Sequence, residues 1–263
     1  MNFNKLRILV IGDKCEDHYT YGNVTRLCPD VPAPVFKPIT TTQTAGMAGN
    51  VARQLEEWGC NVDKKFNEEF ICKHKYIDEK TNHTFLRVDT ETSVQRIQSD
   101  ELRQLVTSAT DKWDAIIVSD YGKGYLHFQD IKTICEAHPL VFIDTKKTLD
   151  YHFKGCAFIK INEPEWEATK HSVDLKSYCT FTDGKTWEDK IIVTLGDTGC
   201  MYKNKVYPVD AVDVFDLSGA GDTFMCGLVV SYILEKSIDK AIHFANECSV
   251  RAVQKKGVAT IEV

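Results

Sequence analysis

The chain lacks several features that mark common protein classes. None of its ten cysteines forms a Cys-x-x-Cys pair, which argues against a zinc site and favours reduced, buried thiols. No apolar run approaches the roughly 20 residues of a membrane-spanning helix. The N-terminal residues lead straight into a short apolar segment without a signal-peptide core. These absences predict a cytoplasmic protein with no membrane partner.

The chain also has fewer basic than acidic residues. The 263 residues contain 32 Lys and Arg against 38 Asp and Glu, which gives a formal net charge of −6. This balance argues against a nucleic-acid-binding surface. The hydrophobic content of 43% is enough to bury a full core. Because the chain has neither an internal repeat nor a low-complexity linker, we expect one domain over residues 1–263.

Short apolar runs alternate with helical patterns along most of the chain. This alternation predicts an α/β sandwich with a mainly parallel sheet. The runs expected to form buried strands are 7–12, 115–119, 140–144, 157–161 and 191–195, and the expected helices are 48–58, 99–112, 128–138, 163–171, 220–235 and 238–255.

Two stretches break the alternation. Residues 14–44 contain four prolines and a Thr-rich tract, and residues 72–98 alternate polar and apolar positions. Both are typical of antiparallel strands outside the main sheet. We expect them to form a small β flap over the carboxyl ends of the main strands, where open α/β sheets bind ligands.

The most informative segment is Val214–Phe224, in which a strand-like run passes through a turn of small residues into an apolar helix. Such a turn lets backbone N–H groups approach a phosphate closely, and the helix N-terminus adds partial positive charge. Asp222 would repel a phosphate, but it suits a base that removes a proton from an attacking hydroxyl. The residues alone leave a second interpretation open, a helix whose first-turn Asp compensates the dipole.

The segment Asp216-x-Ser-Gly-Ala-Gly-Asp-Thr223 closely resembles the Asp-Thr-x-Gly-Ala-Gly-Asp signature of the ribokinase-like (PfkB) carbohydrate kinases. Leu217 stands where that family often has Thr or Val. The resemblance implies a ribokinase-like three-layer α/β/α sandwich and an ATP-dependent phosphotransferase. It also implies that Asp222 is the catalytic base and that Gly219, Ala220 and Gly221 form the anion hole.

Two further segments match the sugar-binding part of that family. Asp17, the fifth residue after Gly12, corresponds to an aspartate that binds sugar hydroxyls; a solvated turn acid is the alternative. The segment from Thr44 to Ala52 resembles the Gly-Gly-x-x-x-Asn-x-Ala element, with alanine at the first glycine and Gly46 at the second. Asn50 would then offer a donor and an acceptor to the substrate, unless it is an ordinary residue of a helix N-terminus.

One subgroup matches better than the rest of the family. Ser119-Asp-Tyr-Gly-Lys-Gly124 and the N-terminal segment resemble the D-glycero-D-manno-heptose 7-phosphate kinases, including the kinase half of the bifunctional heptose kinase/adenylyltransferase. The resemblance implies that a cluster of cations neutralises the phosphate already on the sugar, although each alone could be a surface charge. These cations are Lys73, Lys75, Arg87 and Lys123.

The nucleotide side of the family is matched by three segments. Lys160-Ile-Asn-Glu-Pro-Glu165 resembles the Asn-x-x-Glu motif, whose glutamate helps to hold Mg²⁺ through water; helix capping is the alternative function of this segment. A strand followed by Gly-x-x-Gly, and a later helix, resemble the turn and helix that surround ATP. The residues implied for ATP binding are Lys160, Asn162, Thr194, Gly196, Gly199 and Asn246.

The chain departs from the family between Gly59 and Lys73, where one αβ unit of the sheet is expected to be missing. The implied catalytic residues lie outside this gap. The sequence therefore predicts a kinase for heptose 7-phosphate that uses ATP and Mg²⁺. Two alternatives stay open: a PfkB-type kinase for another sugar, sugar phosphate or nucleoside, and a truncated non-catalytic binding protein. By analogy with the subgroup, we also expect a homodimer formed through the flap.

Overall fold

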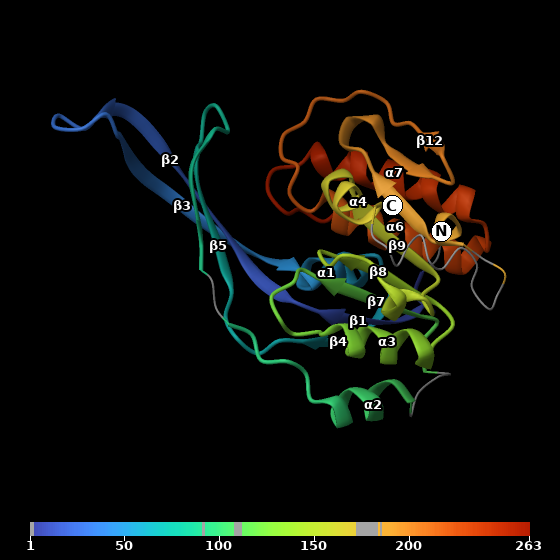
Figure 1. Cartoon of the computed structure of the whole chain (residues 1–263). Helices are drawn as coiled ribbons and strands as arrows, with labels where there is room; N and C mark the ends of the chain where they lie inside the picture. The colour runs from blue at the N-terminus through green and yellow to red at the C-terminus, as the bar shows by residue number, and fades with distance from the viewer. Residues whose placement is uncertain (1–2, 91–92, 108–111, 172–183, 185) are drawn as a thin grey trace.

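The computed structural model describes residues 3–90, 93–107, 112–171, 184 and 186–263. Two separate sheets organise these residues, a large central one and a smaller one that projects to one side (Figure 1). The strands of the central sheet are β1 (Arg7–Gly12), β4 (Asn61–Phe66), β7 (Ala115–Asp120), β8 (Val141–Thr145), β9 (Phe158–Asn162), β10 (Ile191–Thr194), β11 (Cys200–Tyr202) and β12 (Lys205–Tyr207).

The central sheet has eight strands in the order β12-β11-β10-β9-β8-β7-β1-β4. The six strands from β4 to β10 pair in parallel, and β11 and β12 close one edge as an antiparallel hairpin. The predicted α/β fold with a mainly parallel sheet is therefore confirmed. All five predicted strands are present, within one residue at each end.

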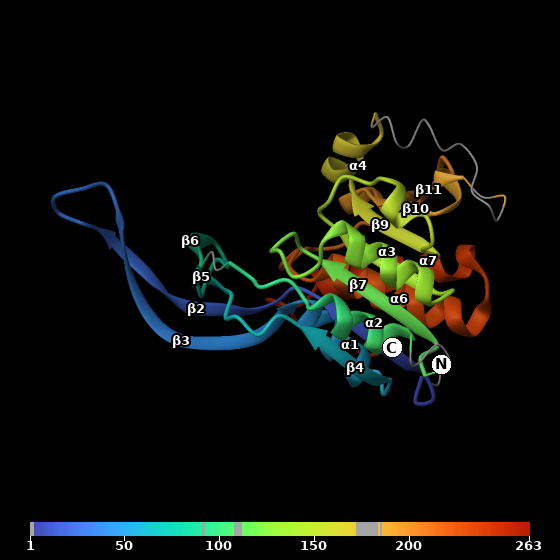
Figure 2. The same ribbon diagram turned by 60° about the horizontal axis from the view of Figure 1, so that its bottom comes forward.

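The inner strands of the central sheet are apolar on both faces because helices cover both sides of the sheet. In β1, Ile8 and Val10 belong to one hydrophobic core, while Leu9 and Ile11 belong to the other. The first core is covered by α1 (Ala48–Glu57), α6 (Ala220–Glu235) and α7 (Ile238–Val253), and the second by α2 (Ser99–Thr107), α3 (Phe128–Ala137) and α4 (Glu163–Thr169). This arrangement is the expected three-layer sandwich, which Figure 2 shows from a second direction.

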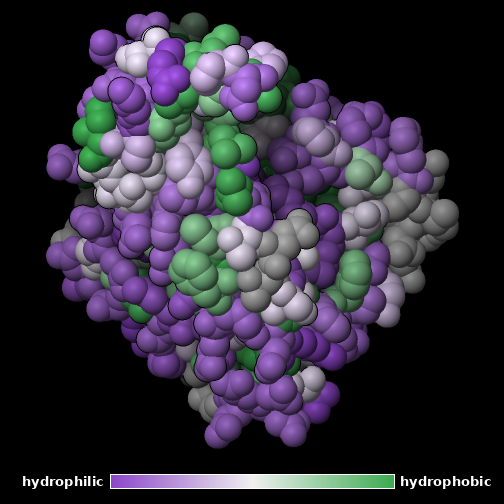
Figure 3. Space-filling view, turned by 90° about the vertical axis from the view of Figure 1, so that its left-hand side faces the viewer, coloured by the Kyte–Doolittle hydropathy of each residue, from purple (hydrophilic) through white to green (hydrophobic). Residues whose placement is uncertain are grey.

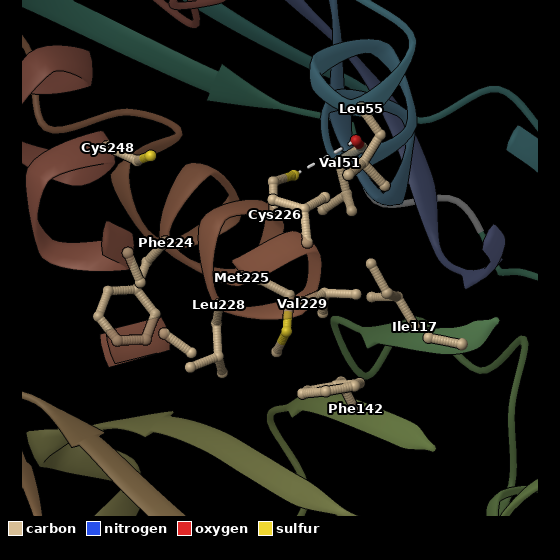
Figure 4. Close-up of a cluster of buried hydrophobic side chains, with 14 of the residues drawn as sticks. Val51, Leu55, Ile117, Phe142, Phe224, Met225, Cys226, Leu228, Val229 and Cys248 are labelled. Carbon is tan, nitrogen blue, oxygen red and sulfur yellow. Dashed lines mark hydrogen bonds between the residues drawn. The ribbon is translucent and has the colours of Figure 1, made fainter. Parts of the chain in front are cut away.

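Helix α6 lies at the centre of the first layer. Its ten consecutive residues from Asp222 to Ser231 are buried, so the helix is apolar around most of its circumference, as expected for an internal helix. Figure 4 shows its side chains between α1 and the sheet, with the Cys226 thiol 3.4 Å from the carbonyl oxygen of Val51. This packing fixes the N-terminus of α6, where the predicted catalytic residue lies.

The flap is a four-stranded sheet in the order β3-β2-β5-β6. Its strands are β2 (Lys14–Leu27), β3 (Pro34–Met47), β5 (Cys72–Asp78) and β6 (Thr84–Asp89). The prediction of purely antiparallel strands was wrong, because β2 and β5 pair in parallel. Figures 1 and 2 show the long β2–β3 ribbon extending well beyond the helical layers.

The expected loss of an αβ unit after Gly59 is only partly correct. Strand β4 follows α1 and pairs in parallel with β1 along all six of its residues, so a strand is present at this edge. No helix lies between β4 and β5 in the structure. The chain therefore passes directly from the sheet edge into the flap.

The helices follow the predicted ranges, and several end earlier than expected. Helix α2 is described only to Thr107, and residues 108–111 of its predicted range lie outside the described residues. Short 3-10 helices occur at Tyr151–Phe153, Trp187–Asp189 and Gly196–Thr198. Within the described ranges, no helix is both long and apolar enough to cross a membrane. The cytoplasmic location stays a prediction.

Candidate active site

The carboxyl ends of the parallel strands bring polar residues to one edge of the sheet. The register places Ser119 opposite Asp144 and Asp144 opposite Lys160, while Asn162 lies opposite Thr194. Ligands of open α/β sheets bind at this edge. The predicted motifs, far apart in the sequence, therefore meet here.

Asp222 lies in the first turn of α6, directly beneath this edge. Gly219 precedes the helix with a left-handed φ of 81°, which turns the chain into α6. The Asp222 carboxylate is buried and accepts two hydrogen bonds, one on each oxygen. Asn50 Nδ2 donates to Oδ2 at 2.8 Å, and the Tyr121 hydroxyl donates to Oδ1 at 2.7 Å.

The pKa of Asp222 is raised to about 6, mainly by burial, and the nearby charge of Asp144 acts in the same direction. The hydrogen bonds from Asn50 and Tyr121 and the charge of Lys160 oppose this change. A carboxylate that titrates near neutral pH is suited to accept a proton from a hydroxyl group.

Asn50 forms two side-chain hydrogen bonds within the protein. Its amide donates to Asp222, and its Oδ1 accepts a 3.1 Å hydrogen bond from Arg53. Arg53 also donates to the carbonyl oxygen of Val258 at 2.7 Å. The Asn50 amide thus links Asp222 to α1, and its contact with a substrate stays a prediction.

The predicted anion hole, Gly219–Gly221, is tightly surrounded. A Cβ atom at Gly219 would lie 3.0 Å from Asn50 Nδ2, and one at Gly221 would lie 2.9 Å from Lys160 Nζ. The absence of side chains at both positions leaves room for these two groups beside the turn. The geometry places the Lys160 ammonium next to the backbone of the turn.

Lys160 is buried and forms a 2.6 Å ion pair with Asp144. Burial alone would lower the pKa of Lys160, but the charge of Asp144 and its hydrogen bond raise it instead. Lys160 therefore stays positively charged beside the turn, where it can interact with a phosphate.

Asp17 lies close to Gly46 on the flap side of the site. A Cβ atom at Gly46 would be only 2.1 Å from Asp17 Oδ2, so a glycine is needed for this approach. Burial raises the pKa of Asp17, and the charges of three flap cations, Lys73, Lys75 and Arg87, lower it. The predicted sugar-binding acid is thus surrounded by the predicted phosphate-binding cations.

These flap cations have different surroundings. The Lys73 ammonium lies over the Tyr121 ring, 5.2 Å from its centroid. Lys75 donates to the Ser218 hydroxyl at 2.7 Å. Arg87 forms two 2.7 Å hydrogen bonds with Asp89.

The fourth predicted cation belongs to the loop after β7. The backbone N–H of Lys123 donates to the buried Asp13 carboxylate at 3.1 Å. The side chain of Lys123 is close enough to Asp89 to lower the pKa of that carboxyl group, after the larger effect of Arg87. Lys123 therefore belongs to the same charged region as Arg87.

A pocket of about 360 Å³ lies on the other side of the turn. Four of the residues predicted to bind ATP line it, together with Ala220 and Gly221. The rest of its wall is largely apolar and includes Val209, Val212, Leu217, Phe224 and Val250. An apolar pocket next to the predicted phosphate-binding turn is suited to a nucleotide base. The four predicted residues are Thr194, Gly196, Gly199 and Asn246.

Asn162 and Glu165 do not line this pocket. They form a capping box at α4, in which Asn162 Oδ1 accepts from the Glu165 N–H at 2.9 Å and Glu165 Oε2 accepts from the Asn162 N–H at 2.8 Å. Glu165 Oε1 accepts a hydrogen bond from Lys146. Both residues line a neighbouring, smaller pocket with Lys146. Asn162 thus caps α4, and its contact with a nucleotide stays a prediction.

Sequence reasoning missed two residues of the site, Tyr121 and Asp13. Tyr121 contacts Asp222 directly. Asp13 accepts hydrogen bonds from the backbone of Tyr121, Lys123 and Tyr125, and so shapes the loop after β7. The position of Tyr121 within the Ser-Asp-Tyr-Gly-Lys-Gly motif was the available signal.

No group of three or more His, Cys, Asp or Glu side chains that could hold a metal ion occurs among the described residues. The acidic side chains at the sheet edge pair instead with lysines, as in the Lys147–Asp120 contact of 2.7 Å. A divalent cation at this edge would need additional ligands from a bound phosphate and from water.

The chain matches the model of the pfkB family of carbohydrate kinases over residues 78–262. It is also similar to the bifunctional protein HldE from several bacteria. The Campylobacter curvus protein is 29% identical over 97% of this chain, and the Desulfatibacillum aliphaticivorans protein is 30% identical over 99%. The chain spans 63% and 62% of the length of these relatives, respectively.

Solved structures with the same fold include ribokinase from Thermotoga maritima, with a TM-score of 0.64 and 18% identity over 96% of this chain and 94% of that one. Phosphofructokinase-2 from Escherichia coli has a TM-score of 0.65 and 14% identity, over 97% of this chain and 94% of that one. These likenesses establish the ribokinase-like fold. Together with the family match, which covers the turn and Asp222, they show that the chain belongs to the pfkB family of carbohydrate kinases, which transfer a phosphoryl group to an alcohol acceptor.

Proposed function

We propose that this chain is an ATP-dependent kinase that phosphorylates the anomeric hydroxyl of D-glycero-D-manno-heptose 7-phosphate. The observation that carries the proposal is the buried Asp222 carboxylate, with a pKa raised to about 6, at the phosphate-binding turn of α6. Asp17, on the flap side, and the pocket next to the turn supply places for a sugar and for a nucleotide.

In the proposed reaction, Asp222 accepts the proton of the anomeric hydroxyl. The sugar oxygen then bonds to the γ-phosphorus of ATP, and the bond to the β-phosphate oxygen breaks to release ADP. The backbone N–H groups of Gly219–Gly221 and the Lys160 ammonium stabilise negative charge on the phosphoryl group as it moves. Asp17 accepts hydrogen bonds from the sugar hydroxyls.

Two observations support a phosphorylated acceptor. Lys73, Lys75 and Arg87 are close enough to Asp17 to oppose the effect of burial on its pKa, so three cations lie on the sugar side of the site. The sequence motifs resemble those of heptose 7-phosphate kinases, and the relatives named above are bifunctional HldE proteins. A sugar bound at Asp17 would bring its distal phosphate to these cations.

Mg²⁺, when bound, would supply positive charge that neutralises the phosphates of ATP. The residues present fit a water-mediated contact better than direct ligation, because both oxygens of Glu165 already accept hydrogen bonds. Mg²⁺ keeps several waters when it binds phosphates, so one acid that orients such a water is sufficient. Glu165 and Lys146 would hold this part of the site.

The position of the new phosphate on the product tests the proposed reaction. We expect ³¹P NMR of a mixture of enzyme, ATP, Mg²⁺ and heptose 7-phosphate to show a new resonance from a phosphate on the anomeric carbon, together with ADP. A phosphate that appears at another carbon would contradict the proposed acceptor hydroxyl. Absence of ADP with every sugar phosphate would contradict the proposed substrate class.

A second candidate is a kinase of the same family that acts on an unphosphorylated sugar or a nucleoside. One observation favours it: Lys75 is bonded to Ser218 and Arg87 to Asp89, so these two cations already have partners. A neutral acceptor would not need to recruit them. Comparing turnover of a sugar with that of its phosphate separates the two candidates.

We also propose that the flap forms a homodimer. Its strands expose several large hydrophobic residues, and Figure 3 shows the flap side with hydrophobic patches set among hydrophilic residues. Covering them against a second copy would remove apolar surface from water. Light scattering coupled to size exclusion would give twice the chain mass if the dimer forms and the single mass if it does not. The exposed residues include Leu27, Ile39, Leu86 and Val88.

A further inference from the structure

We propose that Tyr121 is a positioning residue for the base Asp222, an inference that rests on the proposed kinase function. The Tyr121 hydroxyl donates to Asp222 Oδ1 at 2.7 Å, and Asn50 donates to the other oxygen at 2.8 Å. The two donors come from the loop after β7 and from α1. They hold the carboxylate from two sides and fix its orientation.

Tyr121 acts as the donor toward the ionised Asp222 carboxylate. Its pKa is raised well above the usual value, first by burial and then by the charge of Asp222. The phenol therefore keeps its proton throughout the physiological pH range. Because an ionised carboxylate accepts this proton better than a neutral one, the hydrogen bond favours the charged form of Asp222.

The Tyr121 ring is itself held in place. The backbone N–H of Tyr121 donates to Asp13 at 2.8 Å. The ammonium groups of Lys73 and Lys146 lie 5.2 and 5.4 Å from the ring centroid, one from the flap and one from the loop after β8. The hydroxyl thus reaches Asp222 from a supported position.

The arrangement still leaves room for a substrate. Each carboxylate oxygen offers about two lone-pair sites, and Tyr121 and Asn50 occupy one on each. An acceptor hydroxyl can therefore bond to Asp222 while both donors stay in place. Tyr121 would keep the base ionised and aligned without taking part in proton transfer.

Other groups also act on the charge of Asp222, and the test must leave them unchanged. Asp144 raises its pKa and Lys160 lowers it, and two buried thiols lie close enough to interact with it. Replacing Tyr121 by Phe removes only the hydroxyl and keeps the ring between the two lysines. The two thiols are those of Cys15 and Cys226.

The test compares Tyr121→Phe with wild type and with Tyr125→Phe. Tyr125 is a control from the same loop, because its buried hydroxyl has no hydrogen-bond partner among the described residues. The pH dependence of kcat should show this change. In Tyr121→Phe, the pKa that defines the acidic limb of the profile should rise by about one unit, because loss of a hydrogen bond to a charged group costs about that much free energy. Turnover should then fall about fivefold at pH 6 and little at pH 8. Tyr125→Phe should follow the wild type.

A second readout does not depend on activity. In protein labelled with ¹³C at aspartate carboxyl groups, the Asp222 resonance, assigned with Asp222→Asn, should titrate at higher pH in Tyr121→Phe than in wild type. An unchanged titration and an unchanged acidic limb would overturn the inference. If no sugar or sugar phosphate is turned over, the proposed function fails, whereas the titration still tests the role of Tyr121.

Discussion

The surroundings of Asp222 disfavour the ionised form of its carboxyl group. Burial raises its pKa, and the site only partly compensates through Asn50, Tyr121 and Lys160. A surface acid would be ionised at lower cost but would be a weaker base near neutral pH. For the proposed base, the position at the N-terminus of α6 thus favours catalysis over stability.

Replacing Asp222 by Asn should remove the base while nearly keeping its shape. We expect kcat to fall at least about a hundredfold, because general-base catalysis typically contributes that much. ATP binding, measured by calorimetry, should change little. Asp100→Asn is the matched control, since Asp100 is fully exposed on α2. Normal turnover in Asp222→Asn would remove the assignment of this residue as the base.

The same substitution should stabilise the protein at neutral pH. The pKa of Asp222 is about 6 in the folded state and lies near the usual value of about 3.9 when unfolded, so the folded state binds more protons between these values. The free energy of unfolding therefore decreases as the pH rises through this window, by up to about 3 kcal/mol from this group.

Asp222→Asn removes that decrease, because asparagine does not titrate. Its amide can also accept a hydrogen bond from Asn50 and donate one to Tyr121, so the site keeps both contacts. We expect its melting temperature to exceed that of wild type by several degrees at pH 8, and the difference to shrink toward pH 4. Thermal unfolding at both pH values checks this. A lower melting temperature for the variant at pH 8 would contradict the account.

Asp222 and the turn before it could be predicted because they lie within one contiguous motif. Asp222 and Gly219 follow directly from the Gly-Ala-Gly-Asp turn, and the structure places Asn50 beside them. Tyr121 was missed because its contact with Asp222 joins residues 101 positions apart. Nothing in the local sequence shows which way a loop tyrosine will point.

At the scale of elements, the buried strands were predictable and the flap pairing was not. Apolar runs such as 7–12 can form little other than a covered strand. Strand β4 was missed because its sequence, Asn-Val-Asp-Lys-Lys-Phe, is too polar to resemble a central strand. It can be polar because it lies at the edge of the sheet, where it pairs only with β1.

A substitution in helix α4 can test whether Glu165 has a role beyond capping. Glutamine can replace glutamate in a capping box, so Glu165→Gln should fold normally. If Glu165 orients a Mg²⁺-bound water, this variant should need a higher Mg²⁺ concentration for half-maximal activity. Glu167→Gln, one turn into the same helix, is the control. Identical Mg²⁺ titrations for all three proteins would leave Glu165 as a capping residue only.

A substitution in the flap can test whether the acceptor carries a phosphate. Lys73→Ala should raise KM for the sugar phosphate and leave KM for ATP nearly unchanged. A charge-assisted contact contributes roughly 1.5–3 kcal/mol, which corresponds to about ten- to a hundredfold in KM if binding is at equilibrium. Lys80→Ala, in the exposed turn between β5 and β6, is the control. An unchanged KM in Lys73→Ala would remove the phosphate contact from the proposal.

Across the whole molecule, the flap and the core are joined next to the phosphate-binding turn. Lys75 of β5 bonds to Ser218, and Asn82 donates to the carbonyl oxygen of Phe215 at 2.8 Å. The same loop supplies Val214 and Leu217 to the wall of the larger pocket. The sugar side and the nucleotide side of the site thus share one loop. For this reason Lys75→Ala should affect KM for both substrates, unlike Lys73→Ala.

The most direct test of the account is ADP release by the purified chain with ATP, Mg²⁺ and a panel of acceptors, with Asp222→Asn run in parallel. The panel contains heptose 7-phosphate, the unphosphorylated heptose, other sugar phosphates and nucleosides. We expect fastest turnover with heptose 7-phosphate and at least about a hundredfold less in the variant. Equal turnover of heptose and its phosphate would contradict the proposed substrate, and equal turnover by both proteins would contradict the central role of Asp222.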